Sequence, residues 1–464
     1  MLDLRRIVGW LSQASFHGAG NERVSGICTD SRSADQGSLF VALRGDTFDA
    51  HNFVEQARAS GAAAVLVERW IPGLVPPVIQ VPDSRRALGE IARGWRGQFQ
   101  LPLIAVTGSN GKTTVKEMIA AIIAASVGES ARLATRGNLN NEVGVPLTLL
   151  RLRESHRLAV VELGMNHPGE IAWLSQVARP TIALVNNAQR EHQEFLAGVE
   201  ATARENGSVF AALDASGVAV FPGDDPLHTP IWRALAGTRP TLEFGLTPNG
   251  QGAHASPFAV SAEVGARPDG FDLRSTAGSR RIALAIDGEH NVRNALAAAA
   301  CALAAGIGLD DIARGLERFR PAPGRLVRHR LANGATLIDD SYNANPDSVL
   351  AAIALLAARP APRVLVLGDM GEVGDNGPAW HREVGERAAR DGIEHLLLAG
   401  GASIETAQGY GPSAEHFGDD IAALTVRVSA LATPGASVLV KGSRFMRMER
   451  VVQSMSAQSA NGAH

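Results

Sequence analysis

The most constraining stretch of the chain runs from residue 104 to residue 114 and reads Ile-Ala-Val-Thr-Gly-Ser-Asn-Gly-Lys-Thr-Thr. It joins a short apolar run to a Gly-rich turn, a lysine and two hydroxyls. Apolar residues then recur at helical spacing, at Val115, Met118, Ile119, Ile122 and Ile123. The pattern predicts a buried strand, a turn and the N-terminus of an amphipathic helix, where unpaired amides and the helix dipole favour an anion.

Each residue type in this turn suits a phosphate group. Gly108 and Gly111 let the backbone approach phosphate oxygens, Lys112 supplies a point charge, and Thr113 offers a hydroxyl to Mg²⁺. The turn is shorter than the common G-x-x-x-x-G-K-[ST] form, because Val106 stands where the first glycine is expected. The alternative is an ordinary Gly-rich turn before a helix. The predicted phosphate-binding residues are Gly108, Ser109, Asn110, Gly111, Lys112, Thr113 and Thr114.

Length, charge and cysteine content limit the classes of protein that fit. A chain of 464 residues suggests about three domains. The net charge is −3, so no overall basic field argues for nucleic acid. Cys28 and Cys301 stand far apart without metal-binding spacing, which is typical of a reducing compartment and predicts a cytoplasmic protein. The longest apolar run, 295–309, is shorter than the ~20 residues that span a bilayer, and we identify no signal peptide.

Hydrophobic patterning predicts an α/β protein of three domains, with boundaries after residues 98 and 318. The first domain, 1–98, holds short apolar strands at 38–43, 62–68 and 78–81 and a helical stretch near 53–59. Its loops at 29–32 and 44–51 gather hydroxyls, carboxylates and arginine. They suit a polar, phosphorylated ligand, or they are solvated turns.

The second domain, 99–318, alternates strands at 158–163, 181–185 and 218–221 with helical patterns. This alternation predicts a doubly wound, mainly parallel sheet with the phosphate loop at the carboxyl end of a strand. The stretch 240–287 becomes β-like and predicts an antiparallel edge or insert, with strands at 242–244, 258–264 and 282–286. An Ala-rich helix then opens near Asn291, which either caps it or points at a base.

Polar side chains collect at the predicted carboxyl edge of this sheet. Glu162 ends a buried strand, where a carboxylate needs a cation, so we favour a Mg²⁺ ligand over a strand-end charge. His192 follows the next strand and is either a second metal or phosphate contact or an exposed loop histidine. Asn138, Asn140 and Asn141 form a dense amide cluster that is either a ligand-binding loop or a turn.

The third domain, 319–464, begins with a stretch rich in proline and glycine that suits a hinge. Strands are predicted at 364–367, 395–398 and 438–440. Polar loops at 339–346, 368–372 and 441–444 follow the carboxyl ends of predicted strands. Residues 454–464 lack apolar periodicity and are expected to form a loose tail.

Six collinear motifs resemble one known family. They are Thr-Gly-Ser-Asn-Gly-Lys-Thr-Thr (107–114), Asn-Leu-Asn-Asn-Glu-Val-Gly-Val-Pro (138–146), Glu-Leu-Gly-Met-Asn (162–166), Gly-Glu-His-Asn-Val-Arg-Asn (288–294), Asp-Ser-Tyr-Asn-Ala-Asn-Pro (340–346) and Val-Lys-Gly-Ser-Arg (440–444). Across nearly the entire chain they resemble the Mur ligases of peptidoglycan synthesis. The motifs at 339–346 and 441–444 are most similar to those of the family member that adds D-alanyl-D-alanine to UDP-N-acetylmuramoyl-tripeptide.

The resemblance implies an ATP- and Mg²⁺-dependent amide ligase, expected to be a monomer, with a UDP-sugar domain, an ATP-binding domain and a closing C-terminal domain. The γ-phosphoryl group would activate the tripeptide carboxylate as an acyl phosphate, which the amine of the dipeptide attacks. By family position Lys112, Glu162 and His192 are catalytic. Thr113 and Glu162 hold one Mg²⁺, and Glu162 and His192 a second. Asn291, Arg325 and Asp340 contact the nucleotide. The implied substrate residues are Ser31, Arg32, Asp49, Asn138, Asn140 and Asn141 for the UDP-sugar peptide and Tyr342, Asn343 and Asn345 for the dipeptide.

One departure from the family pattern concerns the second metal. Many members carry a carbamylated lysine fourteen residues past the position of His192, whereas this chain has Asn206. Asparagine forms no carbamate, and its amide oxygen is a neutral, weaker ligand. Adjacent Glu205 is a candidate substitute, although successive helical residues point about 100° apart. We therefore predict that bicarbonate does not stimulate this protein.

Two other functions are considered. One is a folylpolyglutamate-synthase-like ligase, disfavoured because a UDP-sugar-type domain precedes the phosphate loop. The other is a phosphate-loop ATPase that serves as a switch or motor, with the end domains as binding modules. ATP turnover without substrates separates the classes, because a ligase should hydrolyse little ATP until its acid and amine are present.

Overall fold

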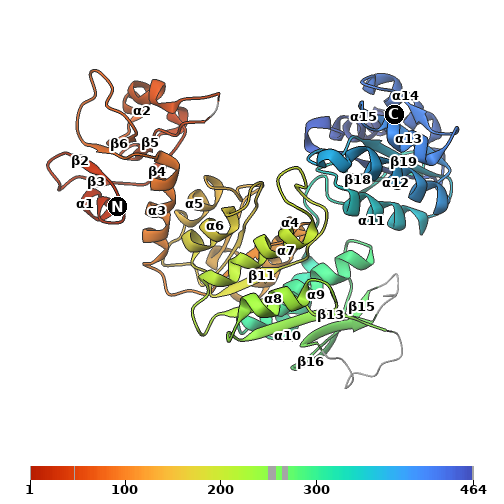
Figure 1. The fold of residues 1–464 in the computed structure, drawn as a ribbon, viewed down its shortest axis with the longest axis horizontal. Helices are drawn as coiled ribbons and strands as arrows, with labels where there is room; N and C mark the ends of the chain where they lie inside the picture. Colours follow the sequence, from red (N-terminus) through yellow and green to blue (C-terminus); the bar gives the residue numbers. More distant parts are fainter. Residues whose placement is uncertain (1, 46, 249–257, 264–269, 462–464) are drawn as a thin grey trace.

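The computed structural model describes residues 2–45, 47–248, 258–263 and 270–461, which form three α/β units in chain order (Figure 1). The N-terminal unit, red to orange, and the C-terminal unit, blue, flank the yellow and green central unit. The boundaries proposed after residues 98 and 318 lie between the last helix of one unit and the first strand of the next. The α/β class expected from the patterning is confirmed.

The N-terminal unit is built on a five-stranded sheet with strand order β2-β7-β6-β5-β4. All neighbours are parallel except β2 with β7. The sheet consists of β2 (Ser15–His17), β4 (Ile27–Cys28), β5 (Leu39–Val41), β6 (Ala64–Val67) and β7 (Val78–Gln80). It packs with α1 (Leu4–Val8), α2 (Val54–Ser60) and α3 (Ser84–Arg96), and β1 (Leu2–Asp3) pairs with β3 (Arg23–Val24).

The central unit is built on a nine-stranded sheet with order β16-β15-β14-β13-β12-β11-β8-β10-β9. The strands are β8 (Leu103–Thr107), β9 (Arg132–Ala134), β10 (Leu158–Glu162), β11 (Ile182–Val185), β12 (Val218–Pro222), β13 (Thr241–Thr247), β14 (Val260–Glu263), β15 (Phe271–Ser275) and β16 (Gly278–Ile282). Parallel pairing runs from β9 to β14, and β15 and β16 are antiparallel.

Helices cover both faces of this sheet, as expected for a doubly wound fold. Alternate residues of β8 belong to different cores: Ile104 and Val106 face one, Leu103 and Ala105 the other. The first core includes α4 (Lys112–Val127), α9 (Glu289–Ala304) and α10 (Leu309–Arg318). The second includes α5 (Gly144–Leu149), α6 (Glu170–Ala178), α7 (Val199–Gly207) and α8 (Thr229–Ala236).

The C-terminal unit has a six-stranded sheet with order β17-β18-β22-β19-β20-β21, in which only β17 runs antiparallel to its neighbour. Its strands are β17 (Val327–Arg330), β18 (Thr336–Asp340), β19 (Arg363–Gly368), β20 (His395–Ala399), β21 (Glu415–His416) and β22 (Ser437–Lys441). One face carries α11 (Pro346–Ala357), α12 (Gly377–Arg390) and α13 (Ile404–Tyr410), and the other carries α14 (Ile421–Leu431) and α15 (Glu449–Asn461).

Three sequence predictions are wrong in detail. The stretch 240–287 is not wholly antiparallel, because β13 and β14 extend the parallel sheet before β15 and β16 turn back. No strand forms at 283–286, since β16 ends at Ile282, and residue 264 of the strand expected at 258–264 lies outside the described residues. The expected tail is helical to Asn461, because Val451, Val452 and Met455 are buried in the C-terminal core.

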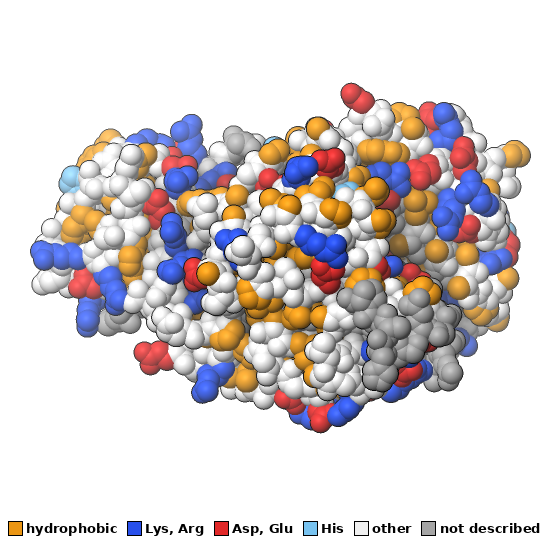
Figure 2. Space-filling view, turned by 60° about the horizontal axis from the view of Figure 1, so that its bottom comes forward, with side chains coloured by type: hydrophobic (Ala, Val, Ile, Leu, Met, Phe, Trp, Pro, Cys, Tyr) orange, Lys and Arg blue, Asp and Glu red, His pale blue; other side chains and the backbone are white. Residues whose placement is uncertain are grey.

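The surface agrees with the nearly balanced charge of the chain. On the face shown in Figure 2, lysine and arginine side chains are interspersed with aspartate and glutamate side chains. Within the described part of the chain, no helix has both the length and the apolar character needed to cross a membrane.

Candidate active site

The stretch from β8 to α4 forms the predicted strand, turn and helix. The apolar residues predicted to line the buried face of α4 (Val115, Met118, Ile119, Ile122 and Ile123) are fully buried. Gly111 precedes the helix with a φ of 81°, and a side chain at this position would approach the Asn294 Oδ1 atom to 2.5 Å. A glycine is therefore required here both by the backbone conformation and by the close approach of α9.

The turn lies at the wall of a cavity of about 1020 Å³ between the central and C-terminal units. Among the predicted site residues, the cavity is lined by Ser109, Asn110, Gly111, Lys112, Thr113, Thr114, Asn138, Asn140, Asn141, Glu162, His192, Asn291, Arg325, Asp340, Tyr342, Asn343 and Asn345. Residues separated by more than two hundred positions in sequence thus share one cavity. Gly108 underlies the turn next to Asn186 and Asn187.

Glu162 has the features of a magnesium ligand. Its Oε1 atom accepts hydrogen bonds from the Thr113 hydroxyl at 3.1 Å and the Asn140 amide at 2.8 Å. Its Oε2 atom is buried and has no hydrogen-bond partner among the described residues. A buried, unpaired carboxylate oxygen beside a threonine hydroxyl fits Mg²⁺, which prefers hard oxygen ligands and takes its remaining ones from water and phosphate.

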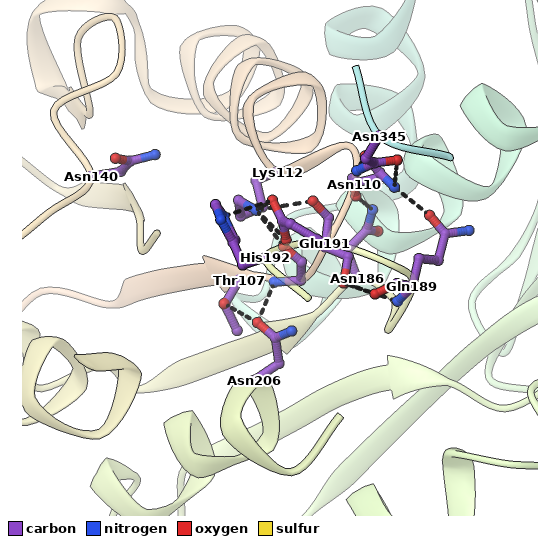
Figure 3. A network of polar contacts seen from close by, with 12 residues as sticks. Thr107, Asn110, Lys112, Asn140, Asn186, Gln189, Glu191, His192, Asn206 and Asn345 are labelled. Carbon is purple, nitrogen blue, oxygen red and sulfur yellow. Dashed lines mark hydrogen bonds and ion pairs between the residues drawn. The ribbon is translucent and has the colours of Figure 1, made fainter. Parts of the chain in front are cut away.

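The ammonium group of Lys112 faces back into the turn and onto a second carboxylate. Its Nζ atom donates to the Gly108 and Ser109 carbonyl oxygens at 2.6 and 3.0 Å. The same atom lies 2.8 and 3.1 Å from the two carboxylate oxygens of Glu191. Both side chains are nearly buried, with exposed fractions of 13% for Lys112 and 11% for Glu191. Figure 3 shows Lys112, Glu191 and His192 gathered in one cluster.

His192 joins this cluster to the C-terminal unit. Its Nε2 atom lies 3.5 Å from Glu191, and its Nδ1 atom forms a 2.6 Å ion pair with Glu372. Burial opposes protonation, but the two carboxylates prevail and raise the pKa of His192 to about 9. A doubly protonated imidazole has no lone pair for a metal, so ligation through Nε2 requires loss of the proton on that atom, while Nδ1 can keep its contact with Glu372.

The described residues contain no group of three or more His, Cys, Asp or Glu side chains arranged to hold a metal ion. The donors Thr113 and Glu162 still fit one Mg²⁺, since this ion is usually held by one or two carboxylates together with substrate phosphates. The second-metal role of His192 stays a prediction.

Asn206 has a different position from that expected of a metal ligand. It is fully buried, and its Oδ1 atom accepts hydrogen bonds from the Thr107 hydroxyl at 2.6 Å and the Gly108 amide at 3.0 Å. Figure 3 shows it below Thr107, away from His192. Glu205 does not substitute, because its carboxylate accepts from the Ile171 amide at the start of α6. Asn206 therefore supports the phosphate loop.

The loop after β11 holds the phosphate loop in place. The Asn186 amide donates to the Asn110 carbonyl and to Asn294, and Asn187 accepts from the Asn110 backbone amide. The side chain of Asn110 donates to Gln189 and exchanges hydrogen bonds with Asn345 of the C-terminal unit, at 3.2 and 2.9 Å. Asn345 also accepts from the Ser348 amide and so caps α11. Its predicted contact with a dipeptide stays a prediction.

Arg190, in the same loop, forms several hydrogen bonds to the C-terminal unit. Its guanidinium donates to Asp347 at 3.0 and 2.7 Å and to Glu383 at 2.6 Å, and its backbone amide donates to Asp347 at 2.7 Å. The guanidinium also lies 5.6 Å from the ring centre of Trp380. The two carboxylates raise the pKa of Arg190, although burial opposes this.

The residues predicted to contact the nucleotide also line the cavity. Asn291 does not cap α9, because Gly288 is the N-cap residue, and its amide donates to the Asp287 carbonyl at 2.6 Å. The guanidinium of Arg325 lies 4.2 Å from the ring centre of Tyr342. Asp340 pairs with Lys441 at 2.7 Å, and burial raises the pKa of Asp340 in spite of that ammonium.

The predicted substrate residues of the N-terminal unit lie apart from this cavity. Ser31 donates to Gln56, and Arg32 forms an exposed pair with Asp30. Asp49 pairs with His51 and Arg69. The described structure does not bring these three residues together with the phosphate loop.

Sequence analysis missed Arg190 and Glu191, which stand beside the singled-out His192, and Asn186 and Asn187, which follow β11. The only available signal was their place at the carboxyl end of the strand next to β8 in a parallel sheet.

Models of three domains match successive parts of the chain. Residues 23–96 match the Mur ligase family, catalytic domain; 106–302 the Mur ligase middle domain; and 324–444 the Mur ligase, glutamate ligase domain. The UDP-N-acetylmuramoyl-tripeptide–D-alanyl-D-alanine ligase of Escherichia coli K12 is 43% identical over 434 residues, 92% of this chain and 93% of the relative.

Solved structures agree in fold over nearly the full length of the chain. The crystal structure of MurF from Acinetobacter baumannii superposes with a TM-score of 0.87 at 36% identity and covers 98% of both chains. MurF ligase from Thermotoga maritima, solved in complex with ADP, superposes with a TM-score of 0.83 at 25% identity, covering 94% of this chain and 98% of its own. Together with the phosphate loop and its cavity, these similarities establish that the chain belongs to the Mur ligase family, among its MurF-type members.

Proposed function

We propose that the protein joins D-alanyl-D-alanine to UDP-N-acetylmuramoyl-tripeptide at the expense of ATP, in the synthesis of peptidoglycan precursors. The main support is the cavity, in which the phosphate loop and Glu162 of the central unit face Tyr342 and Asn343 of the C-terminal unit. The names of the relatives agree with this reaction.

The chemistry requires the activation of a carboxylate, whose negative charge repels nucleophiles. A carboxylate oxygen of the tripeptide attacks the γ-phosphorus of ATP, the bond to the β-phosphate oxygen breaks, and ADP leaves. The amine of the dipeptide then attacks the acyl carbon, and inorganic phosphate leaves as the amide forms and a proton is lost. Such a transfer depends mainly on positioning and on neutralisation of charge.

The residues of the chain supply these two needs. Lys112 and the first amides of α4 bind phosphate oxygens, while Asn186 and Asn187 keep the loop in shape. Thr113 and Glu162 would hold Mg²⁺, which neutralises phosphate charge when bound. Tyr342 and Asn343 extend the cavity on the C-terminal side, where the dipeptide amine must approach.

The UDP-sugar end of the substrate is assigned to the N-terminal unit, at Ser31, Arg32 and Asp49, and its peptide to Asn138, Asn140 and Asn141. The amide cluster lines the cavity, so a substrate that reaches from it to the N-terminal loops would be long, as a nucleotide-linked peptide is. Because ATP is a cytoplasmic substrate, we also propose a cytoplasmic location.

The test is phosphate release by the purified protein with ATP, Mg²⁺ and UDP-N-acetylmuramoyl-tripeptide, with and without D-alanyl-D-alanine. We expect sustained release, matched by formation of the pentapeptide product, only with both substrates. Lys112→Ala should lower kcat by about 100-fold or more, as the loss of one preorganised transition-state contact does. ATP hydrolysis at the full rate without either substrate would instead indicate a switch or motor.

A further inference from the structure

Glu191 has no role in the proposed reaction. Its carboxylate nevertheless binds the ammonium group of Lys112, the group that is expected to bind phosphate. An ammonium group has three protons to donate. Lys112 has four oxygen atoms within hydrogen-bond distance, the carbonyl oxygens of Gly108 and Ser109 and both carboxylate oxygens of Glu191. No proton of Lys112 is left for a phosphate oxygen in this arrangement.

The loop that carries Glu191 is firmly attached to the phosphate loop. The Gln189 amide donates to the Ser109 hydroxyl at 2.9 Å, and the Glu191 amide donates to the Gln189 carbonyl at 2.9 Å. The side chain of Glu191 is only 11% exposed, so its position on Lys112 is set by its surroundings. A carboxylate is thus held on the ammonium group of Lys112, the first residue of α4, and a helix N-terminus is a position that suits an anionic ligand.

We propose that Glu191 is an anionic placeholder for a phosphate group of the nucleotide on Lys112. The inference rests on the proposed use of ATP. Without nucleotide, the carboxylate orients and neutralises the lysine. When ATP binds, a phosphate oxygen replaces the carboxylate on Nζ, and Glu191 retains His192, whose Nε2 atom is 3.5 Å away, as its cationic neighbour. The exchange of one oxyanion for another needs no change in the backbone of the phosphate loop.

The placeholder also makes nucleotide binding selective. An anion can bind Lys112 only after the ion pair between Lys112 and Glu191 is broken. A small anion that makes no other contact in the cavity therefore binds weakly. A nucleotide overcomes this cost through additional contacts in the cavity, such as those predicted for Asn291 and Arg325. Glu191 is accordingly a specificity-determining residue that acts through Lys112.

The experiment compares the wild-type protein with Glu191→Gln by calorimetric titration in EDTA, so that a bound metal does not contribute. Glutamine keeps the size of the side chain and removes its charge. Because a hydrogen bond to a charged group is strong, we expect ATP to bind about tenfold more tightly to the variant, about 1.4 kcal/mol. Adenosine, which has no phosphate, should bind equally to both proteins.

Two further variants separate displacement from other causes. Glu191→Ala should show the same gain, which tests the loss of the carboxylate without an introduced amide. Glu372→Gln removes a carboxylate that contacts His192 but not Lys112, and its effect on ATP affinity should be less than threefold. Equal gains for Glu372→Gln and Glu191→Gln would overturn the proposal, because a general change in charge would then explain both.

Kinetics give a second readout. Glu191→Gln should lower KM for ATP, which a loss of structural support would raise. Unchanged or weaker ATP binding by the variant overturns the placeholder while the proposed ligase activity stands. A wild-type protein that binds ATP but does not join the two peptides, even with Mg²⁺, would contradict the proposed function instead.

Discussion

Substitution of Arg190 by methionine tests how the C-terminal unit is held over the phosphate loop. Arg190 donates three side-chain hydrogen bonds of 3.0 Å or less to Asp347 and Glu383. The exposed fractions are 19% for Arg190, 22% for Asp347 and 44% for Glu383, so the Asp347 contact is well shielded and the Glu383 contact less so. Methionine retains the backbone contact with Asp347 and much of the apolar stem.

The expected cost follows from these contacts. A hydrogen-bonded, mostly buried charge pair contributes about 1.5 to 3 kcal/mol, and a half-exposed pair adds at most about 0.5 kcal/mol. Arg190→Met should therefore reduce the free energy of docking of the two units by about 2 kcal/mol. The loss is below the upper end of the range because Asp347, without its partner, is still stabilised by its place in the first turn of α11. This weakens docking by about thirtyfold.

The assay combines solution scattering with steady-state kinetics. We expect a larger radius of gyration for Arg190→Met and a kcat/KM for amide formation that falls by about ten- to thirtyfold, because Tyr342 and Asn343 are less often opposite Lys112. Arg204→Met is the matched control, since Arg204 forms an exposed pair with Glu200 on the same unit and should have no effect.

A double-mutant cycle identifies the partner. Asp347→Asn should cost little more in the Arg190→Met background, because the interaction is already lost. If Arg190→Met leaves both the scattering profile and kcat/KM at the wild-type level, the assignment of Arg190 to domain docking is refuted.

Three further predictions concern other parts of the chain. Bicarbonate should not stimulate the protein, and bicarbonate-dependent activity of the wild type would contradict this expectation. Asn206→Lys should lower activity at least about tenfold, because it removes the hydrogen-bond acceptor for Thr107 and Gly108. Burial raises the pKa of the Cys301 thiol far above its usual range. A thiol reagent should therefore modify at most Cys28 in the native protein and both cysteines in denaturant. Fast labelling of Cys301 in the folded protein would be inconsistent with its burial.

The third concerns His290. Burial, together with the charge of Lys441, lowers the pKa of His290 to about 4. Its neutral form therefore contributes stability above about pH 6.5, its unfolded pKa, and this contribution is lost as the pH falls towards 4. Imidazole resonances followed by NMR, with His290→Gln for assignment, should show this low value, and titration near pH 6.5 would show that the ring is solvated.

Local sequence was sufficient for the elements and for the phosphate loop. The apolar face of α4, the parallel strands around β8 and the strands β19, β20 and β22 were predicted from patterns a few residues long. Such patterns are reliable because burial repeats with the period of the helix or strand itself. The same logic placed Glu162 at a strand end, where its Oε2 atom is buried without a hydrogen-bond partner among the described residues, as the predicted Mg²⁺ ligand would be.

Only the tertiary structure decided which side chains meet. Lys112 contacts Glu191, 79 residues away, and Asn110 contacts Asn345, 235 residues away. From the family pattern, Asn206 was compared with a lysine that supports a second metal. Its hydrogen bonds to Thr107 and Gly108 show that it supports the phosphate loop. These contacts depend on how loops and whole units pack against one another, and no periodicity along the chain records that packing. Sequence alone predicted an anion-binding turn; the fold determined that a carboxylate of the same chain contacts its lysine.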